Sequence, residues 1–467
     1  MSVSIAWFRR DLRLTDNPAL AAAARADEIV PVFCFEAGLT GGRHRSANRN
    51  AYLLASLREL ADGLRSAGAP LHFRHGDPAT EIPRLASECG AAEVHVNRDH
   101  TAHALSRDSR VAAALEGSGA ALVGHEGIAC ADPDAIRTAD DRPFRVFTPY
   151  FRAWLDASRR DPAPRPRRLV VPAGISVGRP PSKADLGIDT AAERVAAAAG
   201  PGEKKGRELV RRAIEGAGAY AEIRDLPGLD ETTRLSPQLH FGTISALELE
   251  RALARMRSSG AKALRRQLAW RDFWLNVISQ RPANRSEEFD PRFRGMSWRD
   301  DHESLDAWKR GETGVPWIDA GMRQLLAEGW MHNRLRMATA SYLTKNLLID
   351  WREGEAHFMH HLLDGDESQN NGNWQWAASV GADPQPWFRV FNPVRQQSRF
   401  DPDGIYARRW IPEIRKLPDE HLAAPWRAPA AVQEAAGCVI GRDYPEPLVD
   451  LGESRREAIS RFRDQAA

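Results

Sequence analysis

Cysteine, lysine and long apolar runs are all scarce in this chain of 467 residues. The four cysteines show no CxxC spacing, which argues against a disulfide framework or a zinc site and favours a reducing cytosol. No stretch approaches the ~18 apolar residues that a membrane-spanning helix needs. The N-terminal run MSVSIAWFRRDLRL soon becomes charged, so it predicts a first strand and not a signal peptide. We therefore expect a cytoplasmic protein with no membrane partner.

Net charge is also small. Lys and Arg number 65 against 63 Asp and Glu, and only seven of the 65 are lysines. This balance, together with 42% hydrophobic residues, excludes a largely disordered chain and a domain that binds nucleic acid through its bulk charge. Contact with DNA must come from a local patch, and the stretch 389–399 offers three arginines and no acid.

Short β-branched or aromatic runs alternate with amphipathic runs over the first 130 residues. The expected strands are Val3–Phe8, Ile29–Phe35, Leu71–Arg74, Glu93–Val96 and Leu122–Gly124, with helices around Ser46–Ala67, Glu81–Glu88 and Ser106–Gly117. Such alternation predicts an α/β domain with a doubly wound parallel sheet. Neither GxGxxG nor GxxxxGK[ST] follows the first strand, which argues against an ordinary Rossmann dinucleotide site.

Proline-rich segments at 161–168 and 178–182 predict an interdomain linker over residues 131–202. Within it, Val146–Trp154 predicts a short helix with a capping Thr-Pro start. Beyond it the periodicity is almost wholly helical, at Gly206–Ala217, Ala246–Arg257, Ala263–Ser279, Val315–Glu328, Asn333–Leu347 and Gly354–Leu363. The expected organisation is an α/β domain (1–130), a linker (131–202) and a larger all-α domain (203–467).

Two motifs of the helical part carry polar groups suited to a ligand. The run Thr232–Ser236 places hydroxyls and an arginine before Pro237, which is typical of an anion-binding loop and equally of a helix start with Ser236 as N-cap. Further on, Trp330–Met337 sets an amide, a guanidinium and a thioether on one helical face, an odd mixture for a core. The more usual interpretation of this motif is a helix end with a solvated arginine and a methionine that fills a gap.

A third motif, Leu362–Trp376, combines acidic and amide residues with two tryptophans, and we interpret it as a loop that forms a pocket wall. Asp364 and Asp366 are not arranged as in an EF-hand, and the adjacent His360 and His361 point to different faces of a helix. We expect no metal site.

These motifs, taken together, resemble the photolyase/cryptochrome family. DLRLTDNPAL, TTRLS, GWMHNRLRM, IDWREGE, DGD and NNGNWQW occur in the family's order and spacing over essentially the whole chain. The resemblance is greatest to bacterial class I photolyases that repair cyclobutane pyrimidine dimers. It implies an N-terminal antenna domain and a helical domain that binds FAD in a bent form.

The resemblance also implies a set of FAD-binding residues: Tyr220, Thr232, Thr233, Arg234, Leu235, Ser236, Arg336, Asp364, Asp366 and Asn370. Tyr220 precedes the loop that holds the diphosphate. Asp364 and Asp366 match residues near the isoalloxazine and ribose, and Arg336 matches the partner of Asp364. Asn370 matches the residue facing flavin N5, where a neutral amide suits an anionic reduced flavin better than an acid.

Three tryptophans, Trp374, Trp351 and Trp298, match the family's electron-transfer chain from flavin to surface, although each alone is typical of core packing. A second set matches the lesion wall and DNA contacts: Arg224, Gln267, Trp270, Asn333, Arg334, Met337, Trp376 and Gln396. Aromatic faces in this wall would stack a lesion flipped out of the duplex.

One position departs from the dimer-specific pattern, since Gln267 stands where those relatives have a glutamate. Glutamine donates through its amide but supplies no proton. It is also found in relatives that repair the (6-4) photoproduct, but those carry a histidine pair where this chain has Asn333 and Met337. Met337 and Trp376 favour the dimer.

The resemblance thus predicts a monomeric enzyme that repairs cyclobutane dimers in UV-damaged DNA under blue light, by electron transfer from excited reduced FAD. The alternatives are a cryptochrome-type photosensor and a (6-4) photolyase. Arg49 and Asp99 match residues of deazaflavin-binding relatives, whereas folate-type contacts are not evident. We therefore expect a deazaflavin antenna, with solvated surface charges as the other interpretation of both residues.

Overall fold

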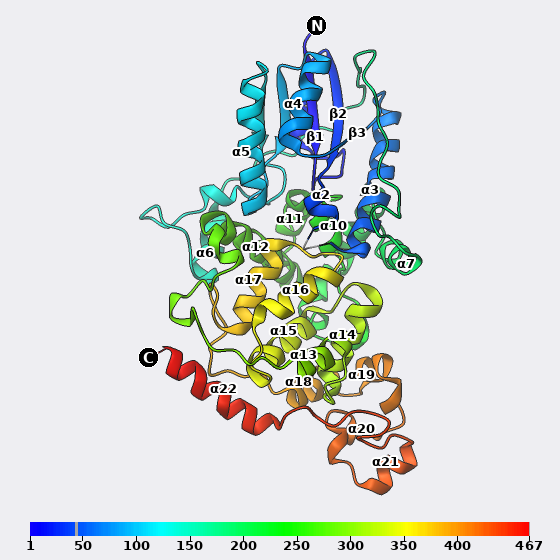
Figure 1. The fold of residues 1–467 in the computed structure, drawn as a ribbon, viewed down its shortest axis with the longest axis vertical. Coiled ribbons are helices and arrows are strands. Elements are labelled where there is room, and N and C mark those ends of the chain that lie inside the picture. The colour runs from blue at the N-terminus through cyan, green and yellow to red at the C-terminus, as the bar shows by residue number, and fades with distance from the viewer. Residues whose placement is uncertain (43–44, 467) are drawn as a thin grey trace. The chain divides into compact units, whose positions relative to one another are not determined.

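A parallel sheet forms the N-terminal part of the computed structural model, which describes residues 1–42 and 45–466 (Figure 1). Its strand order is β3-β2-β1-β4-β5. The strands are β1 (Val3–Phe8), β2 (Glu28–Phe35), β3 (His72–His75), β4 (Glu93–Asn97) and β5 (Ala121–His125). The predicted doubly wound sheet is confirmed, and each predicted strand agrees with the observed one to within one residue at either end.

The central strands β1, β2 and β4 are buried on both faces because their side chains alternate between two cores, whereas the edge strand β5 is partly exposed. In β1, Ile5 and Trp7 join a cluster with helices α4 (Pro78–Cys89) and α5 (Ala102–Glu116). The intervening Ala6 and Phe8 join a cluster with α1 (Pro18–Ala23), α3 (Ala47–Ser66) and α7 (Thr190–Ala198). Burial on both sides explains why the strands read as continuous apolar runs in the sequence.

The proline-rich stretch 131–202 contains two helices, α6 (Phe147–Asp156) and α7. The helix expected at Val146–Trp154 is confirmed, but its predicted cap is wrong. Val146 is the N-cap residue and makes no side-chain capping hydrogen bond, because Thr148 already lies inside the first turn. Residues 157–189, all described, contain no helix or strand, as expected from their prolines, which lack a backbone N–H and restrict their neighbours.

The predicted helices of residues 203–363 are confirmed, with shifted ends. The helices not yet named are α2 (Ala37–Thr40), α8 (Glu203–Glu215), α9 (Tyr220–Ile223), α10 (Ser236–Phe241), α11 (Ala246–Ala254), α12 (Ser259–Gln280), α13 (His302–Arg310), α14 (Pro316–Glu328), α15 (Asn333–Ser341), α16 (Trp351–His361), α17 (Glu367–Ala378), α18 (Pro393–Phe400), α19 (Ile405–Trp410), α20 (Asp419–Leu422), α21 (Ala430–Ala436) and α22 (Leu451–Ala466). A π-helical turn, η6 (Tyr342–Asn346), continues α15.

The interpretation of Leu362–Trp376 as a loop is wrong, because most of this segment forms helix α17. Its amides, glycine and tryptophans follow no apolar period, so helical patterning gave no signal. Side-chain contacts such as that of Gln375 Nε2 with the Asn284 carbonyl, at 2.7 Å, hold the helix instead.

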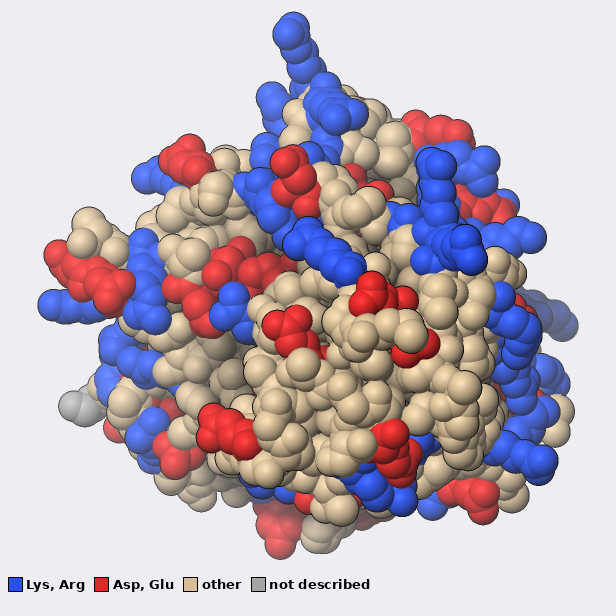
Figure 2. Space-filling model, turned by 90° about the horizontal axis from the view of Figure 1, so that it is seen from above, with Lys and Arg blue, Asp and Glu red and all other residues tan. Residues whose placement is uncertain are grey.

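Two compact units divide the described chain. The first consists of Met1–Ala221, Thr233–Pro282 and Leu363–Ser368, and the second of Glu222–Thr232, Ala283–Leu362 and Gln369–Ala467. The predicted domain boundaries after residues 130 and 202 stay predictions. None of the described helices has both the length and the apolar character needed to cross a membrane. Figure 2 shows acidic and basic side chains intermingled over the face it draws, as the balanced composition leads one to expect.

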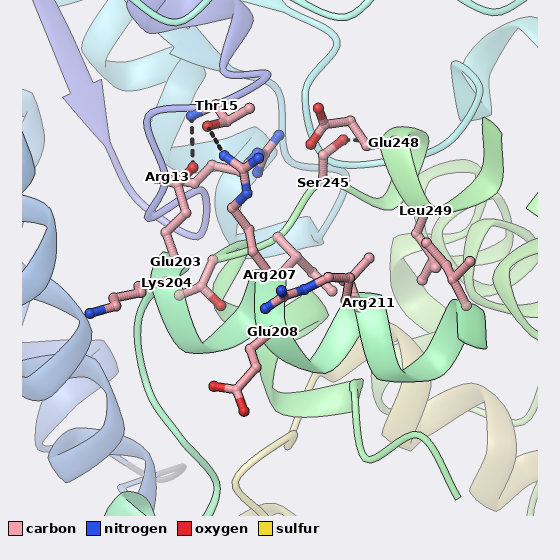
Figure 3. Close-up of a pocket in the computed structure, with 14 residues that line it drawn as sticks. Arg13, Thr15, Glu203, Lys204, Arg207, Glu208, Arg211, Ser245, Glu248 and Leu249 are labelled. Atoms are coloured by element: carbon pink, nitrogen blue, oxygen red, sulfur yellow. Dashed lines mark hydrogen bonds between the residues drawn. The ribbon is translucent and has the colours of Figure 1, made fainter. Parts of the chain in front are cut away.

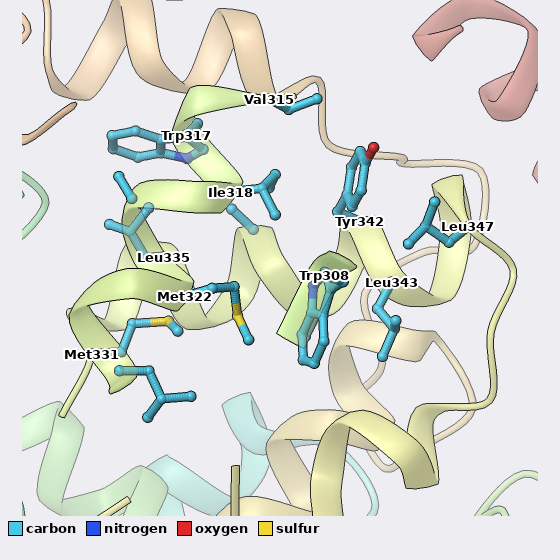
Figure 4. Packing of buried hydrophobic residues seen from close by; sticks show 14 of the residues in the cluster. Trp308, Val315, Trp317, Ile318, Met322, Met331, Leu335, Tyr342, Leu343 and Leu347 are labelled. Atoms are coloured by element: carbon cyan, nitrogen blue, oxygen red, sulfur yellow. The ribbon is translucent and has the colours of Figure 1, made fainter. Parts of the chain in front are cut away.

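The core of the second unit is built from large side chains of α13, α14, α15 and η6 (Figure 4). Trp308 and Trp317 are fully buried, and the Trp308 indole N–H donates to the Thr339 carbonyl at 3.1 Å. Met322 and Leu335 fill the space between these helices. This packed layer gives α15 to α17 a rigid support.

Candidate functional site

The predicted phosphate loop has a strained backbone. Arg234 has φ 47°, in the left-handed region that residues other than glycine rarely adopt. Such strain collects at ligand-holding loops. Ser236 is the first residue of α10 and Leu235 is its N-cap, without a side-chain capping bond, so the interpretation of Ser236 as an ordinary N-cap is wrong. Buried Thr232 Oγ1 has no hydrogen-bond partner among the described atoms, which fits a group that a ligand oxygen would satisfy.

In the first unit, Asp366 belongs to a buried charge network. Its carboxylate pairs with Arg10 and lies 3.6 Å from His240 Nδ1, and Arg10 Nη1 lies 3.6 Å from Asp99 Oδ1. Burial opposes the charge of Arg10, but Asp366 and Asp99 together raise its pKa. Burial likewise would raise the pKa of Asp99, but Arg10 and further arginines lower it. The network fixes two carboxylates around one cation.

Sequence reasoning missed Arg10 and His240. Arg10 directly precedes the DLRL motif and His240 lies one turn beyond Ser236, so their proximity to quoted motifs was the available signal. Burial lowers the pKa of His240 despite Asp366, so this imidazole is neutral at pH 7. Arg10 Nε and Ser368 Oγ are buried without a hydrogen-bond partner among the described atoms. Such donors fit a polar, anionic cofactor of the kind the resemblance implies.

The two predicted antenna residues have their charges engaged within the first unit. Asp99 is buried and paired as described, so the interpretation of it as a solvated surface charge is wrong. Burial lowers the pKa of half-buried Arg49 to about 10, and the Asp364 carboxylate opposes this shift. Both charges are therefore directed at residues of the predicted flavin set or at their partners. A role in antenna binding stays a prediction.

In the second unit, Asn370 is buried on α17 and donates from Nδ2 to the Glu355 carbonyl at 2.9 Å. This bond orients the amide, whose nitrogen carries a second hydrogen. Arg336 donates from Nε to the Met331 carbonyl at 2.8 Å. Its predicted pairing with Asp364 stays a prediction, as does the role of Tyr220, the first residue of α9.

The three predicted electron-transfer tryptophans all lie in the second unit. Trp374 and Trp351 are buried, whereas Trp298 is partly exposed and packs edge-on against Phe462. Trp351 donates its indole N–H to Glu288 Oε1 at 3.2 Å. Trp298 is thus the most exposed of the three, whereas burial does not distinguish Trp374 from Trp351, and the order of electron transfer stays a prediction.

Trp270, predicted for the lesion wall, has one face covered. Its indole stacks on Phe147 of α6 with ring centroids 3.7 Å apart and planes 5° apart. Phe273 contacts it edge-on and Trp274 stacks at 5.6 Å. Gln267 lies three residues earlier on α12 and is half-buried. A partly exposed aromatic side chain supported in this way can stack a base on its remaining face.

The other predicted DNA contacts lie in the second unit. Asn333 is exposed at the start of α15, and Met337, Trp376 and Gln396 are half-buried. Arg334 pairs with Asp225 at 2.7 Å and lies over the Phe400 ring at 4.3 Å, and Arg224 Nε lies 4.0 Å from the same carboxylate. The structure thus brings Arg224 and Arg334 together through Asp225, which sequence reasoning missed.

A pocket of about 480 Å³ in the first unit contains none of the predicted site residues (Figure 3). Three of its charged side chains, Arg13, Glu203 and Arg207, make hydrogen bonds within the protein. Glu203 accepts from the backbone N–H groups of Leu14 and Thr15 at 2.7 and 3.1 Å, and Arg207 donates to Thr15 Oγ1 at 3.2 Å. Arg13 donates to the Gly242 carbonyl at 3.0 Å. The lining therefore fastens the N-terminal segment to α8.

Two family models match the chain. Residues 4–167 match the DNA photolyase model, and residues 264–464 match the FAD binding domain of DNA photolyase. A deoxyribodipyrimidine photo-lyase from Streptomyces griseus is 42% identical over 459 residues, covering 97% of this chain and 98% of the relative.

Solved structures of photolyases and a cryptochrome are also similar to this chain over nearly its whole length. A class III photolyase from Agrobacterium tumefaciens superposes with a TM-score of 0.93 at 35% identity, covering 100% of this chain and 98% of the other. A Synechocystis cryptochrome superposes with a TM-score of 0.89 at 27% identity, covering 98% of this chain and 99% of the cryptochrome. A Sulfolobus tokodaii photolyase with two FAD molecules superposes with a TM-score of 0.81 at 29% identity, covering 99% of this chain and 100% of that photolyase. With relatives this similar over nearly its whole length, the chain belongs to the DNA photolyase family.

Proposed function

We propose that this protein repairs cyclobutane pyrimidine dimers in UV-damaged DNA under blue light. The observation that carries the proposal is the Trp270 platform beside Gln267, in a member of a family whose curated relatives are named deoxyribodipyrimidine photo-lyase. A pyrimidine dimer is poorly stacked and paired, so extruding it costs less than extruding normal bases. The exposed face of Trp270 receives it by stacking.

The predicted FAD-binding residues include polar side chains that can donate hydrogen bonds to the cofactor. Thr232 to Ser236 hold the diphosphate, with the strained backbone at Arg234 shaping the loop. Arg10 holds Asp366 in place, and Asn370, oriented by Glu355, presents a neutral amide to N5. FAD, when bound and reduced, supplies the light-excited electron that splits the dimer. Trp374, Trp351 and Trp298 carry electrons inward to restore the reduced state.

Contacts with the DNA backbone come from a small number of arginines, not from bulk charge. Arg224 and Gln396 on α18 contact phosphates near the flipped lesion, and Arg334, which shares the Asp225 carboxylate with Arg224, belongs to the lesion wall. Because each phosphate contact releases counterions, binding to undamaged DNA is expected to be weak and steeply dependent on salt. The enzyme acts as a cytoplasmic monomer.

An antenna chromophore of the deazaflavin type, rather than a folate, is the proposal for the first unit. Arg49 and Asp99 remain its candidate contacts, although the charge of Arg49 also acts on Asp364, and Asp99 shares Arg10 with Asp366. The Sulfolobus tokodaii relative with two FAD molecules makes a second flavin the competing outcome. Chromatography of chromophores released from the purified protein distinguishes deazaflavin, folate and a second FAD.

Repair under blue light of two substrates, one with a cyclobutane dimer and one with a (6-4) photoproduct, tests the proposed function. We expect repair of the dimer alone by the pre-reduced protein. Repair of only the (6-4) product would overturn the lesion assignment and fit Gln267 as found in those relatives. The likeness to a Synechocystis cryptochrome makes a photosensor the second candidate, and absence of repair with normal photoreduction would favour it.

A further inference from the structure

The middle tryptophan of the proposed electron chain has a charged pair at its indole. Trp351 is fully buried, and its N–H donates to Glu288 Oε1 at 3.2 Å. Arg352 lies over the Trp351 ring, 4.6 Å from the centroid, and pairs with the same Glu288 oxygen at 2.9 Å. Glu288 therefore hydrogen-bonds the indole and also pairs with the cation above it, which Asp350 contacts as well at 3.1 Å.

Glu288 is held firmly in this place. It is buried, whereas Arg352 is partly exposed. The backbone on either side is fixed by Gln375 of α17, which donates to the Glu287 carbonyl at 3.0 Å and accepts from the Phe289 N–H at 2.9 Å. Burial by itself would raise the pKa of Glu288, but the hydrogen bonds from Arg352 and Trp351 outweigh it and lower the pKa. The carboxylate is thus ionised at neutral pH.

We propose that Glu288 is a positioning residue of photoreduction: its carboxylate stabilises the positive charge that forms on Trp351 when this tryptophan passes an electron inward. The inference rests on the proposed electron chain. With FAD bound, one electron would leave the Trp351 indole and fill the vacancy left on Trp374 after that residue reduces the light-excited oxidised flavin, and an external thiol would finally replace the electron through Trp298. No bond between heavy atoms changes, and the Nε1 proton stays in its hydrogen bond to Glu288.

The physical reason is the balance of two charges. The Arg352 cation, 4.6 Å from the ring centroid, disfavours a positive charge on Trp351. The Glu288 carboxylate that accepts from the indole N–H favours such a charge. Both electrostatic effects are strong because Trp351 is buried. With both present, the oxidised indole meets a nearly neutral pair plus a hydrogen bond that strengthens as charge develops. Without Glu288, no anion accepts from the indole N–H, and the Arg352 cation over the ring keeps only its partly exposed pairing with Asp350 at 3.1 Å.

Two matched variants separate this role from simple loss of the ion pair. Glu288→Gln and Arg352→Gln break the same 2.9 Å contact, but they remove charges of opposite sign. We expect Glu288→Gln to slow blue-light photoreduction with a thiol donor by about fivefold or more, and Arg352→Gln to leave it unchanged or faster. Equal slowing of both, or a wild-type rate for Glu288→Gln, would overturn the proposal.

A readout that needs no photochemistry completes the test. The Trp351 indole N–H resonance, assigned by its loss in Trp351→Phe, should move upfield in Glu288→Gln because the bond to an anion is lost, and an unmoved resonance would overturn the proposal. Normal photoreduction by Trp351→Phe would instead refute the electron chain itself. Repair by pre-reduced Glu288→Gln should equal that of the wild type, and a loss there would show a structural effect and overturn the proposal.

Discussion

The stack of Phe147 on Trp270 gives the most demanding test of the lesion wall. Phe147 is almost fully buried on α6, and its ring lies parallel to the indole at 3.7 Å. Replacing Phe147 with leucine keeps most of the volume but removes the flat surface against which the indole rests. Trp270 is then expected to sample several orientations before a lesion binds.

Two contributions determine how much stability and lesion affinity Phe147→Leu should lose. An aromatic pair of this kind stabilises a protein by about 0.5–1.5 kcal/mol beyond its buried area, so Phe147→Leu should lower the free energy of unfolding by roughly 1–2 kcal/mol. Ordering a freed side chain on binding costs about 0.5–1.5 kcal/mol. Affinity for dimer-containing DNA should therefore fall by roughly two- to tenfold, less than the 1–3 kcal/mol expected for Trp270→Ala.

The assay is equilibrium binding to duplexes with and without a single dimer, together with urea unfolding. Phe151→Leu is the matched control, because Phe151 stacks on Phe147 at 5.6 Å and 16° on the same helix. This control should lose some stability while keeping wild-type affinity for the lesion. If both variants lost the same affinity, or if Phe147→Leu bound the dimer as tightly as wild type, the reasoning would be refuted.

Three further expectations concern the flavin, the lesion and stability. Trp374→Phe should block photoreduction but spare repair by pre-reduced enzyme, since Trp374 is not on the path to the lesion; normal photoreduction under blue light would contradict the assigned chain. Gln267→Glu should keep dimer affinity and preserve or raise the repair yield, because an acid whose pKa is raised in a dry pocket donates a stronger hydrogen bond to developing charge; a large fall in quantum yield would count against dimer specificity. Burial lowers the pKa of Lys345 to about 7, so the unfolded chain binds this proton more tightly and stability should rise by on the order of a few kcal/mol between pH 7 and 10. Lys345→Met should remove that rise in urea unfolding at the two pH values, and an unchanged rise would show that other groups cause it.

The sequence by itself determined the elements that depend on local pattern. The five strands were predicted to within one residue because each is a short β-branched or aromatic run between turn residues, and the central three are also buried on both faces. Helices with a clear apolar stripe, such as α12 and α14, were predicted for the same reason. Family membership followed from six motifs in order, since motif order is a property of the chain and needs no coordinates.

Tertiary structure alone decided the partners of the polar and aromatic side chains. Helix α17 has no apolar period, and it is held by core packing of Trp374, Ala377 and Ala378 together with long-range hydrogen bonds such as that of Gln375 to Asn284. Asp99 matched an antenna position by sequence, yet its buried charge is taken up by Arg10, which also holds Asp366. Phe147 supports Trp270, and Glu288 meets Trp351, across long stretches of chain. Such side-chain partners depend on how segments distant in the chain pack together, and the local sequence pattern around each residue does not specify that packing.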